Sequence, residues 1–293
     1  MAQQAAQALL QIENLTVRFG GIVALNAVNF SVKYGSITGL IGPNGAGKTT
    51  VFNCLTGFYR SQAGRILLDA GEQQPIDLRQ LLGSPYEIAD LVHPGRGLSK
   101  LRYNFFGGTH LVARAGIART FQNIRLFADM SVLENLLVAQ HLQVNRNLVA
   151  GFLQTKKFRA AEEAAIDRAY AWLKIVHLES SANALAGSLS YGSQRRLEIA
   201  RAMCTAPRLI CLDEPAAGLN PRETAELAQL IARLRSEHGA TVLVIEHDMS
   251  LVMGISDHVV VLNYGQVIAA DKAAVVQKDP KVLAAYLGTE DQK

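Results

Sequence analysis

The sequence has few cysteines, few charged side chains and no long uninterrupted apolar run. Its three cysteines, Cys54, Cys204 and Cys211, are odd in number and lack the spacing of metal ligands. We therefore expect reduced thiols in a cytosolic protein, rather than a disulfide framework or a zinc site. No apolar stretch approaches the roughly 18 residues that indicate a membrane span, and the N-terminal segment "MAQQAAQALLQ" lacks the basic region of a signal peptide. The sequence thus predicts a chain that does not itself span a membrane.

Charged residues make up only 18% of the 293 residues, against 49% hydrophobic ones, and no low-complexity segment interrupts the chain. This composition is typical of a folded protein rather than a disordered one. The formal net charge is +4, but the basic residues are scattered instead of gathered in a block, so nucleic acid is not specially indicated. A high apolar content with so little charge indicates surfaces that are buried against partners.

Hydrophobic periodicity predicts an α/β protein. The segments "LQIENLTVRFG" and "AVNFSVKYG" alternate, and in the second one Val28, Phe30 and Val32 share a face, which is typical of antiparallel strands with one buried side. The apolar runs "SITGLIG", "RLICLDEP" and "ATVLVIEHD" are continuous and are separated by helical stretches, as expected of parallel strands buried on both faces. We therefore expect a mostly parallel sheet covered by helices, together with an antiparallel β subdomain.

Helix signals dominate residues 123–188, where we find no convincing strand. "SVLENLLVAQH" starts with Ser131 and Glu134 at the spacing of a capping box. In "NPRETAELAQLIARLRSEHG", Asn220 can cap a helix, the following proline suits its first turn, and Gly239 can end it. The pattern predicts a helical subdomain inserted into the α/β core.

Residues 71–110 follow no regular period, because prolines and glycines interrupt them. We expect a surface excursion remote from the chemistry, since it lies between motifs rather than within one. Its basic residues Arg96, Lys100 and Arg102 leave two interpretations open, a solvated loop or a contact for a partner or for anionic lipid.

"GPNGAGKTT", at residues 42–50, fits the phosphate-binding pattern G-x-x-x-x-G-K-[ST] and lies between a predicted buried strand and a helix, as this P-loop requires. Its glycines allow backbone N–H groups to close around phosphate oxygens, and the helix N-terminus adds its positive dipole end. We expect Lys48 to contact the outer phosphates, Thr49 to ligate Mg2+ and Thr50 to add a phosphate contact. The alternative is an ordinary strand-to-helix turn. The predicted nucleotide-binding residues of this loop are Gly42, Asn44, Gly45, Gly47, Lys48, Thr49 and Thr50.

The run "RLICLDEP" ends in two acids, Asp213 and Glu214. Carboxylates at the carboxyl end of a buried parallel strand face the ligand crevice of the sheet. We expect Asp213 to hold Mg2+ through its water shell, and Glu214 to orient and deprotonate the water that attacks the γ-phosphate. In the alternative interpretation the two acids only cap the next turn.

The stretch "LSYGSQRRLEIARA" resembles the "LSGGQ" signature of ABC-type ATPases, and the resemblance covers nearly the whole chain. Phe19 falls where an aromatic ring stacks on adenine, Gln122 in "RTFQ" falls at the Q-loop, and His247 in "VIEHD" falls at the switch histidine, all in the family's order. The resemblance implies that Gln122 and His247 join Glu214 in catalysis, and that Gln122 also contacts Mg2+.

The signature and the neighbouring D-loop depart from the family pattern. Tyr191 replaces the first glycine, Ser193 replaces the glutamine, and Asn220 stands where aspartate is common. Ser190 and Gly192 remain to bind phosphate, and Ser190 can cap the helix as well. These departures, with "DEPAAGLNP", "GIARTFQNIRLFADMSVLENLLVA" and the ending "AAYLG", resemble the ATPase subunits of branched-chain amino acid importers.

The resemblance implies a single P-loop NTPase domain of the ABC type at residues 9–288. We expect its α/β core, with the antiparallel β subdomain, at 9–122 and 195–265. The helical subdomain with the signature would lie at 123–194, and a C-terminal segment at 266–293.

In this family a P-loop and a signature within one domain point away from each other, so the resemblance implies two domains packed head to tail with ATP and Mg2+ at each joint. The implied partners are a second ATPase subunit, of the same or a homologous chain, integral membrane permease subunits and, indirectly, a periplasmic substrate-binding protein, with no nucleic acid. The implied location is the cytoplasmic face of the inner membrane, as a peripheral subunit.

Three other functions stay open at this point. One is the ATPase of a lipid or lipopolysaccharide exporter, because such sequences share "EIARA" and a similar D-loop. Another is a soluble ABC ATPase that acts on nucleic acid or the ribosome, although the chain has neither two ATPase domains nor a long coiled coil in place of the helical subdomain. The third is a scaffold that binds nucleotide without hydrolysing it, which the presence of Glu214 and His247 opposes.

Overall fold

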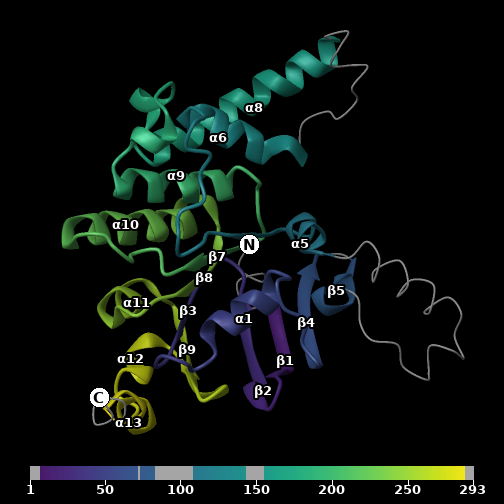
Figure 1. Cartoon of the computed structure of the whole chain (residues 1–293), viewed down its shortest axis with the longest axis vertical. Coiled ribbons are helices and arrows are strands. Elements are labelled where there is room, and N and C mark those ends of the chain that lie inside the picture. Colours follow the sequence, from purple (N-terminus) through teal and green to yellow (C-terminus); the bar gives the residue numbers. More distant parts are fainter. Residues whose placement is uncertain (1–6, 72, 83–107, 143–154, 288–293) are drawn as a thin grey trace, which may run out of the picture.

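The computed structural model describes residues 7–71, 73–82, 108–142 and 155–287. Two sheets and a group of helices make up this part of the chain (Figure 1). Within these ranges, no helix combines the length and the apolar character needed to cross a bilayer.

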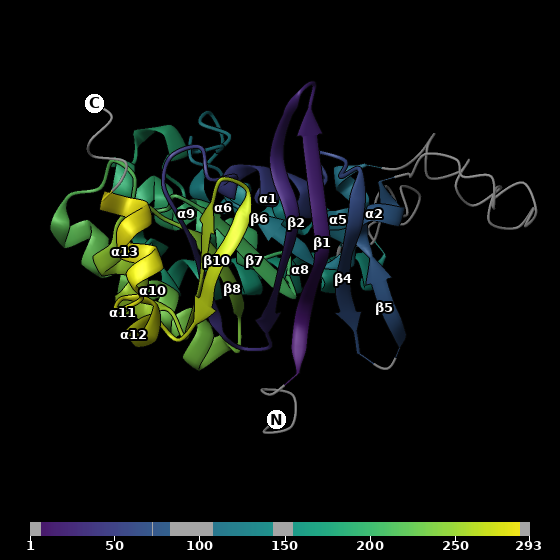
Figure 2. The same ribbon diagram turned by 90° about the horizontal axis from the view of Figure 1, so that it is seen from below.

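The first sheet is antiparallel and forms the β subdomain. Its strands are β1 (Ala8–Phe19), β2 (Ile22–Lys33), β4 (Ala63–Ala70) and β5 (Gln73–Asp77), in the spatial order β2-β1-β4-β5. Figure 2 shows the two long strands β1 and β2 side by side, with β4 and β5 beyond them. Val28, Phe30 and Val32 of β2 are buried, which confirms the predicted apolar face.

Strand β5 lies inside the segment that shows no period in the sequence, and the pattern there did not predict it. Pro75 belongs to this strand, and a proline is tolerated because β5 is at the sheet edge, where a missing N–H breaks no ladder. A short helix, α2 (Leu78–Leu81), follows, with Asp77 as its N-cap. Residues 83–107 of the predicted excursion lie outside the described residues.

The second sheet is mostly parallel and forms the core. Its strands, in spatial order, are β10 (Gln266–Asp271), β9 (His258–Asn263), β3 (Ile37–Ile41), β8 (Thr241–Ile245), β7 (Leu209–Asp213) and β6 (Ile117–Arg119). Every residue of β3, β7 and β8 is buried, and these strands pair in parallel, as the continuous apolar runs predicted. β10 pairs with β9 in the antiparallel sense.

Six helices accompany the core sheet and the edge near β6. They are α1 (Lys48–Leu55), α5 (Thr109–Ala115), α10 (Pro221–His238), α11 (Met249–Ile255), α12 (Ala273–Val276) and α13 (Pro280–Leu287). Helix α10 starts with a capping box at Asn220 and ends at Gly239 in the left-handed conformation, which confirms both predicted boundaries.

The described part of the predicted helical region contains α-helices and 3-10 helices, joined by turns and irregular segments. It contains α6 (Val132–Ala139), η2 (Gln140–Leu142), α8 (Lys156–Ile175), η3 (Glu179–Ser181), η4 (Ala186–Ser188) and the start of α9 (Tyr191–Met203). The capping box of Ser131 and Glu134 is present at α6, as predicted. Figure 1 shows α6 and α8 at the end of the molecule opposite β1 and β2. A buried cluster that includes Leu173, Leu197 and Leu230 joins α8, α9 and α10, so this region shares an apolar core with the sheet.

Candidate functional site

The P-loop leaves the carboxyl end of β3 and enters α1. A Cβ atom on Gly42 would overlap the carbonyl oxygen of Leu262, and one on Gly47 would lie 2.8 Å from the carbonyl oxygen of Ala24. Both glycines have positive φ, 151° and 104° respectively. Gly45 also has positive φ, but open space surrounds its position. Only glycine therefore fits at positions 42 and 47. The absence of side chains there lets the loop pass close to β9 and β2.

Lys48 is buried at the centre of this loop. Its Nζ donates to the carbonyl oxygens of Gly42 at 2.6 Å and Pro43 at 3.0 Å. Burial lowers the pKa of the Lys48 ammonium, and the charge of Glu214 opposes this shift. Thr49 and Thr50 follow in the first turn of α1. The loop thus surrounds one cation at the N-terminus of an eight-residue helix, an arrangement that suits an anionic ligand.

Glu214 brings together three of the residues predicted from the sequence. Its Oε1 lies 2.7 Å from Nε2 of His247, and its Oε2 accepts a hydrogen bond from Nε2 of Gln122 at 2.7 Å. The three residues follow β7, β8 and β6, whose carboxyl ends meet at one edge of the parallel sheet. Glu214 has a φ of 46°, which is uncommon for a residue with a side chain. The structure therefore assembles this trio within one chain, at the sheet edge where the P-loop also begins.

Asp213, at the end of β7, is buried, and its Oδ2 accepts from Arg119 at 2.6 Å. The Asp213 carboxylate, the Thr49 hydroxyl and the Gln122 amide each offer an oxygen atom, and oxygen is the ligand type that Mg2+ prefers. No group of three or more His, Cys, Asp or Glu suited to a metal ion occurs within the described ranges. These residues therefore fit a Mg2+ that is bound together with nucleotide phosphates, as Mg2+ usually is, rather than by a protein cage.

Phe19 ends β1 with an exposed ring. It is 47% exposed, and it packs against Tyr59 in a T-shaped arrangement with the ring centroids 5.1 Å apart. An aromatic ring that has one packed neighbour and is half open to solvent suits stacking on a planar base. Stacking on adenine stays a prediction for Phe19.

The signature residues lie at the start of α9. Ser190 is the N-cap, because its Oγ accepts from the backbone N–H of Ser193 at 3.3 Å, as predicted. A Cβ atom on Gly192 would come within 2.6 Å of Oε1 of Glu223, so glycine allows α9 to pack closely on α10. None of the hydrogen bonds and ion pairs of the described residues joins Ser190 or Gly192 to residues 42–50.

Tyr191, which replaces a signature glycine, packs on the D-loop of the same chain. A Cβ atom on Gly218 would lie 3.2 Å from the Tyr191 ring, and Gly218 has a φ of 80°. The Tyr191 hydroxyl accepts from Arg195 at 3.3 Å. The departure from the family signature thus connects the start of α9 with the turn before α10.

The sequence patterns did not predict two residues that lie at the site. Glu246 is buried beside His247, and its carboxylate accepts from the backbone N–H groups of Ala216 at 2.7 Å and of His247 at 3.1 Å. Burial raises the pKa of this carboxyl. Tyr286 of α13 forms a hydrogen bond with the backbone of Gly42, and burial raises its pKa to about 12. An acid inside an apolar run was the only available signal for Glu246, and nothing local indicated Tyr286.

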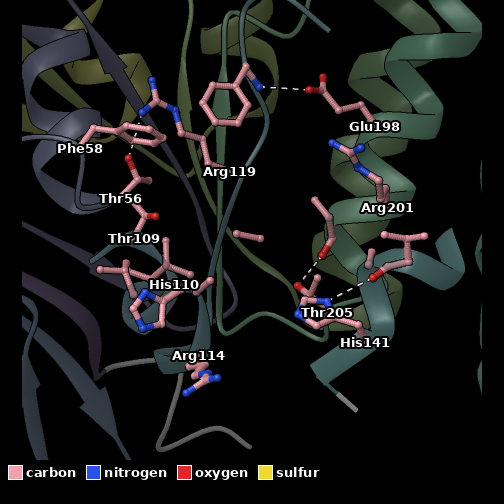
Figure 3. Close-up of a pocket in the computed structure, with 18 of the residues that line it drawn as sticks. Thr56, Phe58, Thr109, His110, Arg114, Arg119, His141, Glu198, Arg201 and Thr205 are labelled. Atoms are coloured by element: carbon pink, nitrogen blue, oxygen red, sulfur yellow. Dashed lines mark hydrogen bonds between the residues drawn. The ribbon is translucent and has the colours of Figure 1, made fainter. Parts of the chain in front are cut away.

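A groove of about 590 Å³ lies between α5 and β6 on one side and α6 and α9 on the other (Figure 3). Its apolar lining includes Phe58, Phe127 and Val138, which are 50%, 51% and 40% exposed. Polar groups that line it include Arg119, His141, Glu198 and Arg201. The groove thus lies between the core and the helical region, next to the segment that carries Gln122.

All three cysteines are buried, and none of them belongs to a disulfide among the described residues. Burial raises the pKa of each thiol to about 12. Such thiols are poor nucleophiles and poor metal ligands, so they take no part in the site.

The P-loop, the paired acids, the Q-loop glutamine, the signature and the switch histidine define an ATP-binding cassette. The family model described as ABC transporter matches residues 25–217, and the chain belongs to this family of ATPases. A second model, described as branched-chain amino acid ATP-binding cassette transporter, matches residues 266–292. The C-terminal segment that reaches the P-loop through Tyr286 is therefore the segment typical of that subgroup.

The comparisons with individual proteins agree with both family models. The chain is 50% identical to the high-affinity branched-chain amino acid transport ATP-binding protein BraF of Pseudomonas aeruginosa, over 96% of this chain and 98% of that protein. It is 48% identical to the high-affinity branched-chain amino acid transport ATP-binding protein LivG of Escherichia coli, over 97% of this chain and 99% of that protein. The crystal structure of the ADP conformation of MJ1267, an ATP-binding cassette of an ABC transporter, superposes with a TM-score of 0.71 at 32% identity, over 96% of this chain and 99% of that one. The predicted fold class is thereby confirmed.

Proposed function

We propose that this chain hydrolyses ATP to power the import of branched-chain amino acids through a membrane permease. The observation that carries the proposal is Glu214 held between Gln122 and His247, beside a P-loop, in a chain that resembles branched-chain amino acid transport ATP-binding proteins over nearly its full length. Hydrolysis needs a base next to the bound phosphate. A scaffold that only binds nucleotide would not need such a base.

The residues divide the chemistry among them. Lys48 and the N–H groups at the start of α1 bind the phosphates, and Phe19 stacks on adenine. Glu214 takes the proton of the attacking water, while Gln122 and His247 hold its two carboxylate oxygens in place. Thr49, Asp213 and Gln122 would hold a Mg2+, which would neutralise the charge of the phosphates.

The second half of each site comes from a partner ATPase subunit. Among the described residues, no hydrogen bond or ion pair joins Ser190 or Gly192 to the P-loop of their own chain, and Ser190 is exposed, which supports a role toward the nucleotide of a second chain. If this chain pairs with itself, its specific ATPase activity should rise with protein concentration, because only the dimer holds complete sites. Turnover per chain would be measured across a dilution series, with mass determined by light scattering at each point. Constant turnover in a proven monomer would contradict the split site.

We assign the permease contact to the groove between the core and the helical region. Its exposed apolar residues Phe58, Phe127 and Val138 offer a surface that a membrane subunit can bury, and it lies beside the Q-loop. The chain would then sit at the cytoplasmic face of the membrane as a peripheral subunit, held there by the permease. A periplasmic binding protein would choose the substrate on the other side.

Uptake measurements test this function. Deletion of the gene should abolish high-affinity uptake of leucine, isoleucine or valine, and a plasmid copy should restore it. Val138→Glu in that copy should lower uptake more than it lowers hydrolysis by the purified chain, because a charge in the groove opposes burial against an apolar partner. A matched control is Glu237→Gln on the exposed face of α10, which should support normal uptake. Normal uptake of all three amino acids in the deletion strain, with a defect in lipid export instead, would favour the exporter.

A further inference from the structure

Arg119 connects the strand end that bears Asp213 to the P-loop helix. Its NH2 donates to Oδ2 of Asp213 at 2.6 Å. Its NH1 donates to Oδ1 of Asn53 at 2.8 Å and to Oγ1 of Thr56 at 2.9 Å, both in the last part of α1 or just after it. Figure 3 shows Arg119 beside Thr56 and Phe58 on one wall of the groove. A single guanidinium on β6 therefore joins β7 to α1.

The surroundings hold this guanidinium in place. Its central carbon lies 5.0 Å from the ring centroid of Phe121, 5.6 Å from that of Phe58 and 5.8 Å from that of Phe52. The side chain is only 9% exposed, and that of Asp213 only 8%. Three aromatic faces exclude water and favour the cation electrostatically, so Arg119 keeps one geometry. A charge pair this poorly hydrated is strong and directional.

The elements that Arg119 joins carry two of the three residues predicted to hold Mg2+. Asp213 ends β7, and Thr49 lies one helical turn before Asn53 on α1. No hydrogen bond of the described residues involves Oδ1 of Asp213, so the bond to Arg119 directs one carboxylate oxygen and leaves the other for a ligand.

We propose that Arg119 is a positioning residue for the metal: it orients the Asp213 carboxylate and fixes the separation between Asp213 on β7 and Thr49 on α1. This inference rests on the proposed function, because it takes Asp213 and Thr49 as residues that hold Mg2+, Asp213 through the water shell of the ion. In this role Arg119 acts through Asp213 and α1 rather than as a ligand itself. Its loss therefore alters metal binding more than nucleotide binding.

The test measures Mn2+ binding to the purified full chain in the presence of a non-hydrolysable ATP analogue, with free Mn2+ followed by electron paramagnetic resonance. Arg119→Met should weaken Mn2+ binding by about tenfold, the scale found when the partners of metal ligands are removed. Arg119→Lys should recover part of this loss, because a lysine supplies the charge but cannot bridge Asp213 and α1 together. Binding of the analogue with excess chelator should change less than about twofold in both variants, whereas a general loss of structure would lower it too.

Arg125, which lies over the same Phe121 ring as Arg119, provides a matched control. Arg125 stacks over Phe121 at 4.2 Å, and no hydrogen bond joins its side chain to Asp213, so Arg125→Met should leave Mn2+ binding unchanged. Arg119 variants that bind Mn2+ as tightly as the unaltered chain, or more tightly, would overturn the inference. If Arg119→Met does not fold, Mn2+ binding by Arg119→Lys alone tests the positioning role.

Asp213→Asn separates this inference from the function on which it rests. If Asp213→Asn weakens Mn2+ binding and the Arg119 variants do not, only the positioning role fails. If Asp213→Asn also leaves Mn2+ binding unchanged, the assignment of Asp213 as a metal ligand fails first.

Discussion

Glu214→Gln should slow ATP hydrolysis by a factor of at least about 100 and leave ATP binding intact. Glutamine keeps the size of the side chain, and its amide oxygen can still accept the hydrogen bond from Gln122. It cannot take a proton from water, so the loss falls on the chemical step. With ATP bound and not hydrolysed, the variant should accumulate as a closed dimer. Phosphate release, equilibrium ATP binding and size-exclusion chromatography with ATP measure these three effects.

Two comparisons make that result specific. Lys48→Ala should weaken ATP binding itself, because Lys48 is the cation at the centre of the P-loop. Glu237→Gln removes an equivalent charge from an exposed acid that pairs with Arg233 on the same helix, and it should change neither binding nor turnover. Near-normal turnover of Glu214→Gln would remove Glu214 from the role of general base.

The parts of the site that the sequence predicted depend on local rules. The P-loop needs glycine where its backbone passes close to β2 and β9, and a lysine that its own carbonyl oxygens surround. The strands β3, β7 and β8 are buried on both faces, so each is a continuous apolar run, and their carboxyl ends must share one edge. The meeting of Gln122, Glu214 and His247 follows from that topology.

Contacts between distant segments were not predictable in the same way. Arg119 and Asp213 are 94 residues apart, and nothing near Arg119 in the sequence marks it as the partner of a buried acid. Pro75 argued against a strand, yet the edge position of β5 accommodates it. In "RRLEIARA" the charged residues have the spacing of a solvated helix face, but Arg195 and Glu198 lie fully inside the protein.

The Arg195–Glu198 pair joins α9 to the Q-loop backbone. Arg195 donates from NH1 to Oε2 of Glu198 at 2.9 Å and to the carbonyl oxygen of Phe121 at 2.6 Å, and from NH2 to that of Gln122 at 2.7 Å. Oε1 of Glu198 accepts from the backbone N–H groups of Phe121 and Arg125, each at 3.3 Å. Burial raises the pKa of Glu198, and the charge of Arg195 opposes this shift. The pair thus holds the segment that presents Gln122 to Glu214.

Arg195→Met should destabilise the chain by about 3–5 kcal/mol, because it leaves the Glu198 carboxylate buried without its cation. The neighbouring Arg196 is a matched control: it is 24% exposed and pairs with the partly exposed Glu226, so Arg196→Met should cost about 1 kcal/mol or less. Urea unfolding measures both. The loss for Arg195→Met should shrink from pH 8 to pH 5, since the unpaired carboxyl, with its pKa raised above the unfolded value, takes up a proton as the pH falls. Equal losses for the two variants, or a loss for Arg195→Met that does not change with pH, would show that the ion pair does not hold the Q-loop to α9.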